Sequence, residues 1–174
     1  MSRRLLRLIG LLAAVGAVAA TASVAPAGAR VIRSGVITIG RGAGPITLGM
    51  SRSQVVSKLG RPLYENANGY MQYAQLPSIF DIYRTGGGSR TRVRMLVIGG
   101  SGFKLSDGNK IFARGGLRRL SKRYGKQLKF HNTPDTGPYY ELISRFQKRR
   151  VRTQFFVTRR SLDATVLDVF ILFG

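Results

Sequence analysis

The sequence predicts an α+β fold of two pseudo-repeats, each with a short helix, or a helix pair, packed on an antiparallel sheet of three to four strands. Two observations support this prediction. Two short amphipathic segments with a helical pattern end in glycine, at Ser51–Gly60 and Leu117–Gly125. Each is followed by three runs rich in aromatic and β-branched residues, which are typical of strands. The same order of elements therefore occurs twice along the chain.

The pattern divides the chain into four segments. They are a secretory signal peptide at 1–29, a flexible or strand-like lead-in at 30–45, a first α+β repeat at 46–105 and a second α+β repeat at 106–174. The chain is 44% hydrophobic, which is enough apolar content for it to fold rather than stay disordered.

The first segment has the three parts of a signal peptide. Arginines precede the apolar stretch Leu8–Ala20, and small residues that fit an A-x-A cleavage site follow it. The alternative is an uncleaved membrane anchor, but Thr21, Pro26 and Gly28 make the second half less apolar than a membrane span requires. Cleavage after Ala29 would give a secreted protein, extracellular or held in the cell envelope.

Ser51 begins the first predicted helix. Its hydroxyl is placed to cap the helix, and Gln54, three residues later, completes a capping box. Val55 and Leu59 share an apolar face, which must pack on another element because so short a helix is not stable alone. Gly60 suits the position that ends the helix.

Three strand-like runs follow each predicted helix. In the first repeat they are YMQYA from Tyr70, SIFDIYR from Ser78 and VRMLVIG from Val93, with Gly86–Ser89 as a hairpin loop. The second helix carries Leu117, Leu120 and Tyr124 on its apolar face. Its strand-like runs are YYELISRF from Tyr139, RVRTQFFVT from Arg150 and TVLDVFILF from Thr165.

The segment ITLGMSRSQVVSKLGRP, Ile46–Pro62, contains a recognisable motif. Its residues are Ile46, Leu48, Gly49, Met50, Ser51, Gln54, Val55, Leu59, Gly60 and Pro62. The motif resembles the helix-turn signature of the SmpA/OmlA-type outer-membrane lipoproteins, whose fold is shared by the tandem-repeat β-lactamase inhibitor proteins. The similarity covers Ile46–Ile98 well and the second half only weakly. It implies a helix-on-sheet module that binds proteins and is not an enzyme, although the chain has no cysteine for a lipid anchor.

Charge is the most unusual property of the composition. The 29 Lys and Arg residues face 7 Asp and Glu, which gives a net charge of +22. Removal of the signal peptide would lower it only to +19, because three arginines and no acidic residue would leave. Such a field attracts phosphate polymers, anionic lipid surfaces and acidic proteins. The expected partner is therefore an envelope protein or an anionic polymer, such as teichoic acid or nucleic acid.

Few residues are available for catalysis or metal binding. There is no cysteine, and the single histidine, His131, lies in the turn-rich stretch FHNTPDTG without an evident partner nucleophile. The chain contains neither a G-x-S-x-G elbow nor a phosphate-binding loop. We therefore expect no enzymatic activity, no cofactor and no metal site.

Two sets of side chains are candidates for binding. The anionic-ligand patch would join the outer face of the second helix to the following hairpin, and it comprises Arg114, Arg118, Arg119, Lys122, Arg123, Lys126, Lys129, Lys148, Arg149, Arg150 and Arg152. The candidate sheet contact comprises Tyr70, Tyr73 and Tyr83. The sheet contact and the resemblance favour a protein-binding adaptor or inhibitor-like module, and the patch favours the alternative, a basic polyanion binder.

The acidic residues are few, so their positions are informative. Asp168 interrupts an apolar run, and we expect it to face solvent or to meet an arginine such as Arg152. The same expectation applies to Glu141. Asp107 precedes Gly108 and is expected in a turn.

Overall fold

The computed structural model describes residues 30–75, 77–85 and 91–174. The predicted signal peptide and the hairpin loop predicted at Gly86–Ser89 lie outside these residues. Within them the chain forms two sheets and two α-helices. None of these helices is long and apolar enough to cross a membrane.

The larger sheet has eight strands, and every neighbouring pair is antiparallel. In spatial order they are β4 (Tyr64–Glu65), β5 (Tyr70–Gln72), β6 (Ile79–Thr85), β7 (Arg92–Gly99), β12 (Val166–Phe173), β11 (Arg149–Val157), β10 (Gly137–Phe146) and β9 (Lys129–Thr133). The smaller sheet has the order β3 (Ile46–Thr47), β2 (Gly42–Ala43), β1 (Gly35–Thr38) and β8 (Phe103–Leu105).

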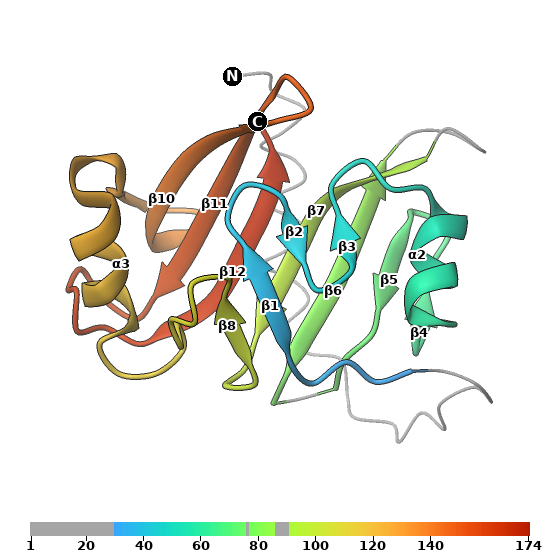
Figure 1. Ribbon diagram of the computed structural model, residues 1–174, viewed down its shortest axis with the longest axis horizontal. Helices are drawn as coiled ribbons and strands as arrows, with labels where there is room; N and C mark the ends of the chain where they lie inside the picture. Colours follow the sequence, from blue (N-terminus) through green and yellow to red (C-terminus); the bar gives the residue numbers. More distant parts are fainter. Residues whose placement is uncertain (1–29, 76, 86–90) are drawn as a thin grey trace.

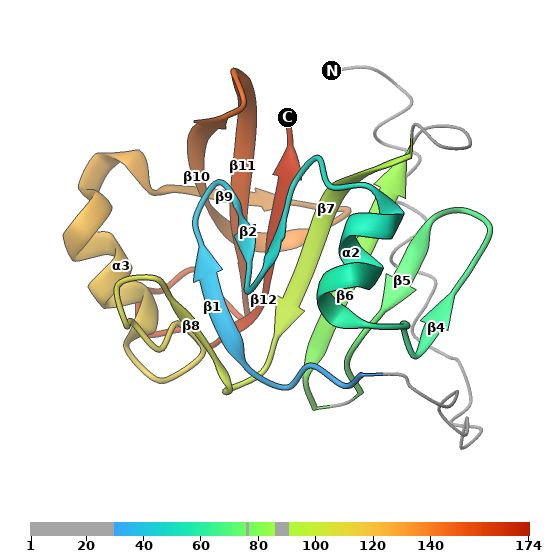
Figure 2. The same ribbon diagram turned by 45° about the vertical axis from the view of Figure 1, so that its right-hand side comes forward.

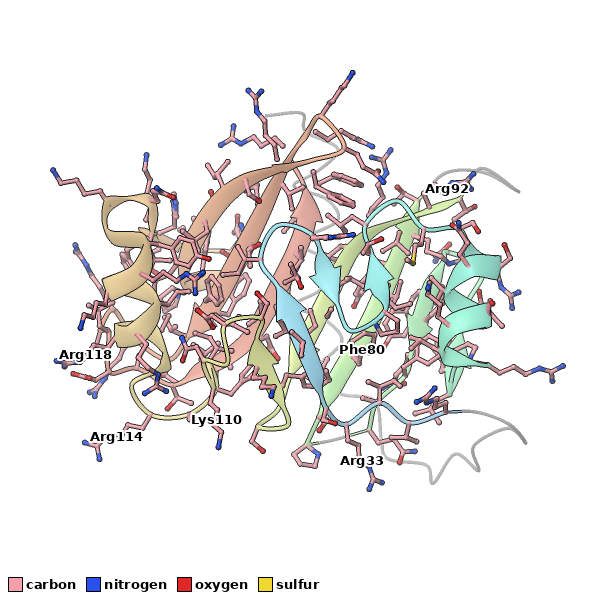
Figure 3. All side chains as sticks on the ribbon, viewed as in Figure 1. Arg33, Phe80, Arg92, Lys110, Arg114 and Arg118 are labelled. Atoms are coloured by element: carbon pink, nitrogen blue, oxygen red, sulfur yellow. The ribbon has the colours of Figure 1, made fainter. Side chains whose placement is uncertain are left out.

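One face of the eight-stranded sheet carries all the remaining elements. Figures 1 and 2 show the small sheet lying across its middle, with α2 (Arg52–Leu59) on one side and α3 (Gly116–Tyr124) on the other. A short 3₁₀ turn, η3 (Gly125–Gln127), follows α3. The hydrophobic core lies between these elements and the large sheet. Phe80 of β6, labelled in Figure 3, stacks there on Phe103 of β8, with ring centroids 5.8 Å apart.

The predicted fold class is wrong. We expected two α+β repeats, each with its own small sheet, whereas the structure is mostly β, with one continuous eight-stranded sheet and a second sheet. The continuity arises because β7 pairs with β12, placing Leu96 opposite Ile171 on the core side and Val97 opposite Phe170 on the other. Both strands are apolar on both faces, and this pattern identifies a strand without specifying its neighbour.

The individual elements agree better with the sequence. The helices predicted at Ser51–Gly60 and Leu117–Gly125 are α2 and α3, and the six strand-like runs correspond to β5, β6, β7, β10, β11 and β12. The lead-in is strand-like at β1 and β2. The sequence analysis missed β3, β4, β8 and β9. His131 lies in β9 and not in a loop.

The start and end of α2 follow the predicted local chemistry. The Ser51 hydroxyl accepts a hydrogen bond from the Gln54 backbone N–H, and the Gln54 side chain accepts one from the Ser51 N–H at 2.8 Å. Gly60 ends the helix with a φ of +79°, which suits glycine. The Tyr73 hydroxyl donates to the Gly60 carbonyl at 3.0 Å, so the end of α2 is tied to the core.

An ion-pair network attaches α2 to the edge of the sheet. Glu65 of β4 accepts hydrogen bonds from Arg52 of α2, at 2.8 Å, and from Arg84 of β6, at 2.6 Å. Only 7% of the Arg84 side chain is exposed, so this charge needs the carboxylate. Val55 and Leu59 meanwhile bury the apolar face of the helix. The network and this packing fix α2 against the sheet.

The turn between β1 and β2 packs directly on β10 and β11. The Gly40 N–H donates to the Thr153 hydroxyl at 2.9 Å, across the two sheets. Gly40 has a φ of +72°, and a Cβ at this position would collide with the Ser144 hydroxyl. Glycine is therefore required here both for its backbone conformation and for this close approach.

We predict that Ser51→Ala destabilises the protein by about 1 kcal/mol, because it removes the acceptor for the Gln54 backbone N–H. The measurement is the free energy of unfolding from urea titration. Ser57→Ala is the matched control, since Ser57 is exposed inside the same helix and alanine favours helix there. Equal stability of the two variants would contradict a capping role for Ser51.

Candidate binding surface on the eight-stranded sheet

The second face of the eight-stranded sheet, here called the back face, carries no helix or strand from the described residues (Figures 1 and 2). Side chains alternate along each strand, so the strand registers define this face. It includes Tyr64, Tyr70, Gln72, Ile79, Asp81, Tyr83, Met95, Val97, Lys129, His131, Tyr139, Glu141, Ile143, Arg145, Arg150, Arg152, Gln154, Phe156, Asp168, Phe170 and Leu172.

Aromatic rings extend inward from both edges of the back face. From the β4 edge, the ring centroids of Tyr64 and Tyr70 are 5.9 Å apart, and those of Tyr70 and Tyr83 are 5.1 Å apart. The β9 side has a second series, with centroid distances of 5.1 Å for His131–Tyr139, 5.2 Å for Tyr139–Phe156 and 4.5 Å for Phe156–Phe170. Tyr139 is only 7% exposed, whereas the other rings are partly exposed or exposed. Exposed rings in such contact present a rigid surface, which is typical of protein-binding interfaces.

The candidate sheet contacts divide between two environments. Tyr70 and Tyr83 lie on the back face, opposite each other across β5 and β6. Tyr73 is fully buried in the core and holds the end of α2 through Gly60, so it is not a surface contact residue. Tyr73 lies three residues after Tyr70, so strand alternation places it on the opposite side of the sheet, toward the core.

The rings of β10, β11 and β12 were missed as contact residues. Tyr139, Phe156 and Phe170 belong to runs that are apolar at most positions. In such runs, alternation alone does not identify the side of the sheet on which a ring lies. A polar residue two positions away could have identified the face, because residues i and i+2 of a strand lie on the same side of the sheet. Asp168 provides this signal for Phe170, and Gln154 provides it for Phe156.

Three of the seven acidic residues in the chain, Asp81, Glu141 and Asp168, lie on the back face. Glu141 has its partners within the chain. Its carboxylate is 2.6 Å from Arg152 and 2.9 Å from the Gln154 amide, and His131 lies 4.0 Å away. The expectation that Glu141 is ion-paired or at a strand edge is met by this pair with Arg152.

Asp81 and Asp168 lack such partners. Neither forms an ion pair with any described residue, and Asp81 Oδ1 is buried without a hydrogen-bond partner. Arg152, the expected partner of Asp168, pairs with Glu141 instead. Asp168 lies opposite Gly99, where a Cβ would come within 2.6 Å of its Oδ1. The glycine therefore leaves room for this half-buried carboxylate.

Burial of the two carboxylates changes their titration. The pKa of Asp81 is raised to about 6, chiefly by burial; a hydrogen bond from Tyr70 opposes this rise, and the nearby Asp168 charge adds a smaller increase. Burial also raises the pKa of Asp168. The back face thus holds two adjacent carboxylates that are poorly compensated within the chain.

The basic residues of α3 form an exposed cationic surface. Figure 3 shows Arg114 and Arg118 directed away from the sheet, while Leu117 and Leu120 are buried beneath the helix. Two of its arginines are neutralised, Arg118 by Asp163 and Arg123 by Asp107, both at 2.7 Å. Arg119 donates to Asn109, and the exposed residues without an ion pair in the described chain are Arg114, Lys122, Lys126 and Lys129.

The predicted single basic patch is not formed. Lys148, Arg149 and Arg150 lie at the turn that joins β10 and β11, as expected, where Gln147 and Lys148 have positive φ. In Figures 1 and 2 this turn projects from the end of the sheet, whereas α3 lies at its side. Arg152 is engaged by Glu141 on the back face. The two basic clusters are therefore separate surfaces.

Asp107 lies in a turn, as predicted. Its Oδ1 accepts a hydrogen bond from the Asn109 backbone N–H in the turn that follows β8. In the part of the chain that the structure describes, no three His, Cys, Asp or Glu side chains are grouped as a metal site would require.

Comparisons with protein-family models, curated proteins and solved structures found no match. The resemblance to the SmpA/OmlA-type lipoproteins therefore stays a prediction.

We predict that Asp81→Asn stabilises the protein at pH 8 by up to about 3 kcal/mol. This is the free energy that corresponds to raising the pKa of Asp81 from 3.8 to about 6. The folded state binds the Asp81 proton more tightly than the unfolded state, so this carboxylate lowers stability as pH rises from about 4 to about 6. The stabilisation should therefore vanish near pH 4. Urea unfolding of both proteins across this range measures it.

Asp163→Asn is the control for this prediction, because its ion pair with Arg118 lowers the pKa of Asp163. Its carboxylate favours the folded state once deprotonated, so its removal should lower stability slightly at pH 8 and have no effect at low pH. If Asp81→Asn were as stable as the wild type at every pH, Asp81 would not be an uncompensated carboxylate.

Proposed function

We propose that this chain is an exported, non-enzymatic binding protein whose back face binds a segment of a partner protein. The segment would carry arginine or lysine side chains between apolar ones. Export is proposed from the signal-like sequence of residues 1–29. The resemblance of Ile46–Pro62 to a family of protein-binding modules supports the same class of function.

The observation that carries this proposal is the pair of unpaired carboxylates, Asp81 and Asp168. A half-buried carboxylate without a cation costs folding stability. The chain has 29 basic residues, yet none of those described lies within ion-pair distance of either carboxylate. Such uncompensated groups are typical of functional sites, where a ligand supplies the missing partner.

The surroundings of the carboxylates determine the chemistry of this partner. Tyr70 and Tyr83 lie to one side of Asp81, and Phe170 and Phe156 lie toward the other half of the sheet. A guanidinium or ammonium group can contact a carboxylate and an aromatic face together, and apolar neighbours in the same segment can cover the remaining rings. An acidic partner would instead be repelled by Asp81 and Asp168, whose charges have no ion-pair partner among the described residues.

The experiment selects peptides from a random display library on the immobilised protein. We expect enrichment of peptides with arginine or lysine beside aromatic or aliphatic residues. Asp81→Asn combined with Asp168→Asn should weaken these peptides by about tenfold or more, because two charge-assisted contacts are lost. The control is Asp107→Asn with Asp163→Asn, which removes the same charge near α3 and should leave affinity nearly unchanged.

The affinity of the selected peptides should also depend on pH. It should fall as pH decreases below about 6, because protonation of Asp81 removes the charge that attracts the cation. The variant with both asparagines should lack this dependence. Selection of acidic peptides, or equal affinity of the two double variants, would exclude the back face as a site for cationic segments.

A further inference from the structure

Three guanidinium groups and two phenylalanine rings alternate at the end of the sheet that carries the β10–β11 turn. Arg41 lies 5.6 Å from the ring centre of Phe146. Arg149 and Arg94 both lie over Phe173, at 4.2 Å and 5.6 Å from its ring centre. These five side chains are called here the arginine–phenylalanine row. They lie on the core side of the sheet, opposite to the back face.

Strand register and a bulge bring the row together. Phe146 and Arg149 lie directly opposite each other across β10 and β11. Phe173 pairs with Val151, two residues beyond Arg149, so ring and guanidinium are diagonal neighbours on one face. Arg94 is the extra residue of an irregularity in β7, where Met95 and Val93 pair with successive residues of β6. Such bulges commonly redirect a side chain.

The row holds positive charge without a carboxylate. Neither Arg41, Arg94 nor Arg149 forms an ion pair in the described chain, whereas Arg52, Arg84, Arg118, Arg123 and Arg152 all do. Burial lowers the pKa of Arg94, and the charge of Arg149 lowers it further. The two guanidinium groups over Phe173 therefore repel each other, and the structure contains no group that offsets this repulsion among the described residues.

Further cations lie at the same end of the sheet. Arg145 and Arg150 are directly opposite each other in the β10–β11 pair, on the side of the back face, and both are exposed. Lys148 occupies the turn itself, with a φ of +62°. Like charges placed directly across two strands destabilise a sheet. An anion bound at the row would offset the repulsion between Arg94 and Arg149.

We propose that the arginine–phenylalanine row is a binding site for a phosphate group, held between Arg94 and Arg149 with Arg41 beside them. The planar guanidinium groups rest on ring faces, which leaves their N–H edges available to donate to phosphate oxygens in pairs. The ring contacts also restrict the side chains before binding, so less entropy is lost on binding. Lysine would not provide this combination of stacking and paired donation.

This site does not depend on the back face, since the two lie on opposite sides of the sheet and differ in charge. It also differs from the predicted patch on α3. There, Arg118 and Arg123 already have Asp163 and Asp107 as partners, and the remaining cations are separately exposed. The row combines close cations, rings and the absence of an ion pair in the described chain, which makes it the stronger phosphate site.

The test uses tripolyphosphate as the probe and isothermal titration calorimetry as the measurement. Arg94→Gln with Arg149→Gln should weaken binding by about tenfold or more, because two charge-assisted donors are lost. Lys122→Gln with Lys126→Gln removes the same charge from α3 and should weaken binding by only about twofold, through the general field. Equal losses in both double variants would reduce the effect to net charge and overturn the proposal.

A second arm identifies the source of the phosphate. Flotation with phosphatidylglycerol vesicles is compared between the same two variants. If the variant with Arg94→Gln and Arg149→Gln binds both the vesicles and tripolyphosphate more weakly, and the lysine control does not, the site accepts lipid phosphate. If its affinity falls for tripolyphosphate only and its binding to vesicles is unchanged, the site accepts soluble phosphates. Either result supports the site, and unchanged affinity for both probes would overturn it.

Arg149→Lys keeps the charge and tests the guanidinium group directly. We expect tripolyphosphate affinity to fall about threefold to tenfold, since an ammonium group cannot donate in a paired geometry. Melting in phosphate-free buffer should be nearly unchanged, because no ion pair within the described chain is broken. Wild-type affinity in this variant would contradict the proposed geometry even if the double variant failed to fold.

Discussion

Pairing of β7 with β12 holds the two halves of this protein in one sheet. Leu96 and Ile98 of β7 lie opposite Ile171 and Val169 of β12, and all four are buried in the core. The small sheet lies across this junction, and α2 and α3 cover the two sides (Figure 1). Loss of this pairing would expose two apolar strand edges and divide the core, so the shared core depends on it.

The same pairing creates the surface that we propose as the partner site. On the back face it places Val97 opposite Phe170 and Gly99 opposite Asp168, which brings the Asp168 charge close enough to raise the pKa of Asp81. These two carboxylates come from different halves of the sequence. Their proximity is therefore a property of the joined sheet. Two half-buried carboxylates without ion-pair partners lower the stability of the folded protein. Burial of the apolar side chains where β7 meets β12 offsets this cost.

The sequence was sufficient for features that depend on local chemistry. The capping box of Ser51 and Gln54 could be predicted because it involves only residues three positions apart. The end of the helix at Gly60 could be predicted because glycine readily adopts the positive φ found there. The sequence was insufficient for strand neighbours, because β7 and β12 are apolar on both faces. The strands β3 and β4 were missed because each has only two residues. The unpaired state of Asp168 could not be predicted, since it depends on Arg152 binding Glu141 instead.

A net charge of +22 acts differently on the two proposed sites. At long range the field attracts an anion to the arginine–phenylalanine row and repels a cationic segment from the back face. Binding at the back face must therefore rely on short-range contacts with the rings and with Asp81 and Asp168. Salt screens the long-range field more than these half-buried contacts. Rising ionic strength should thus weaken the phosphate site while it eases approach to the back face, so the two sites favour different ionic conditions within one molecule.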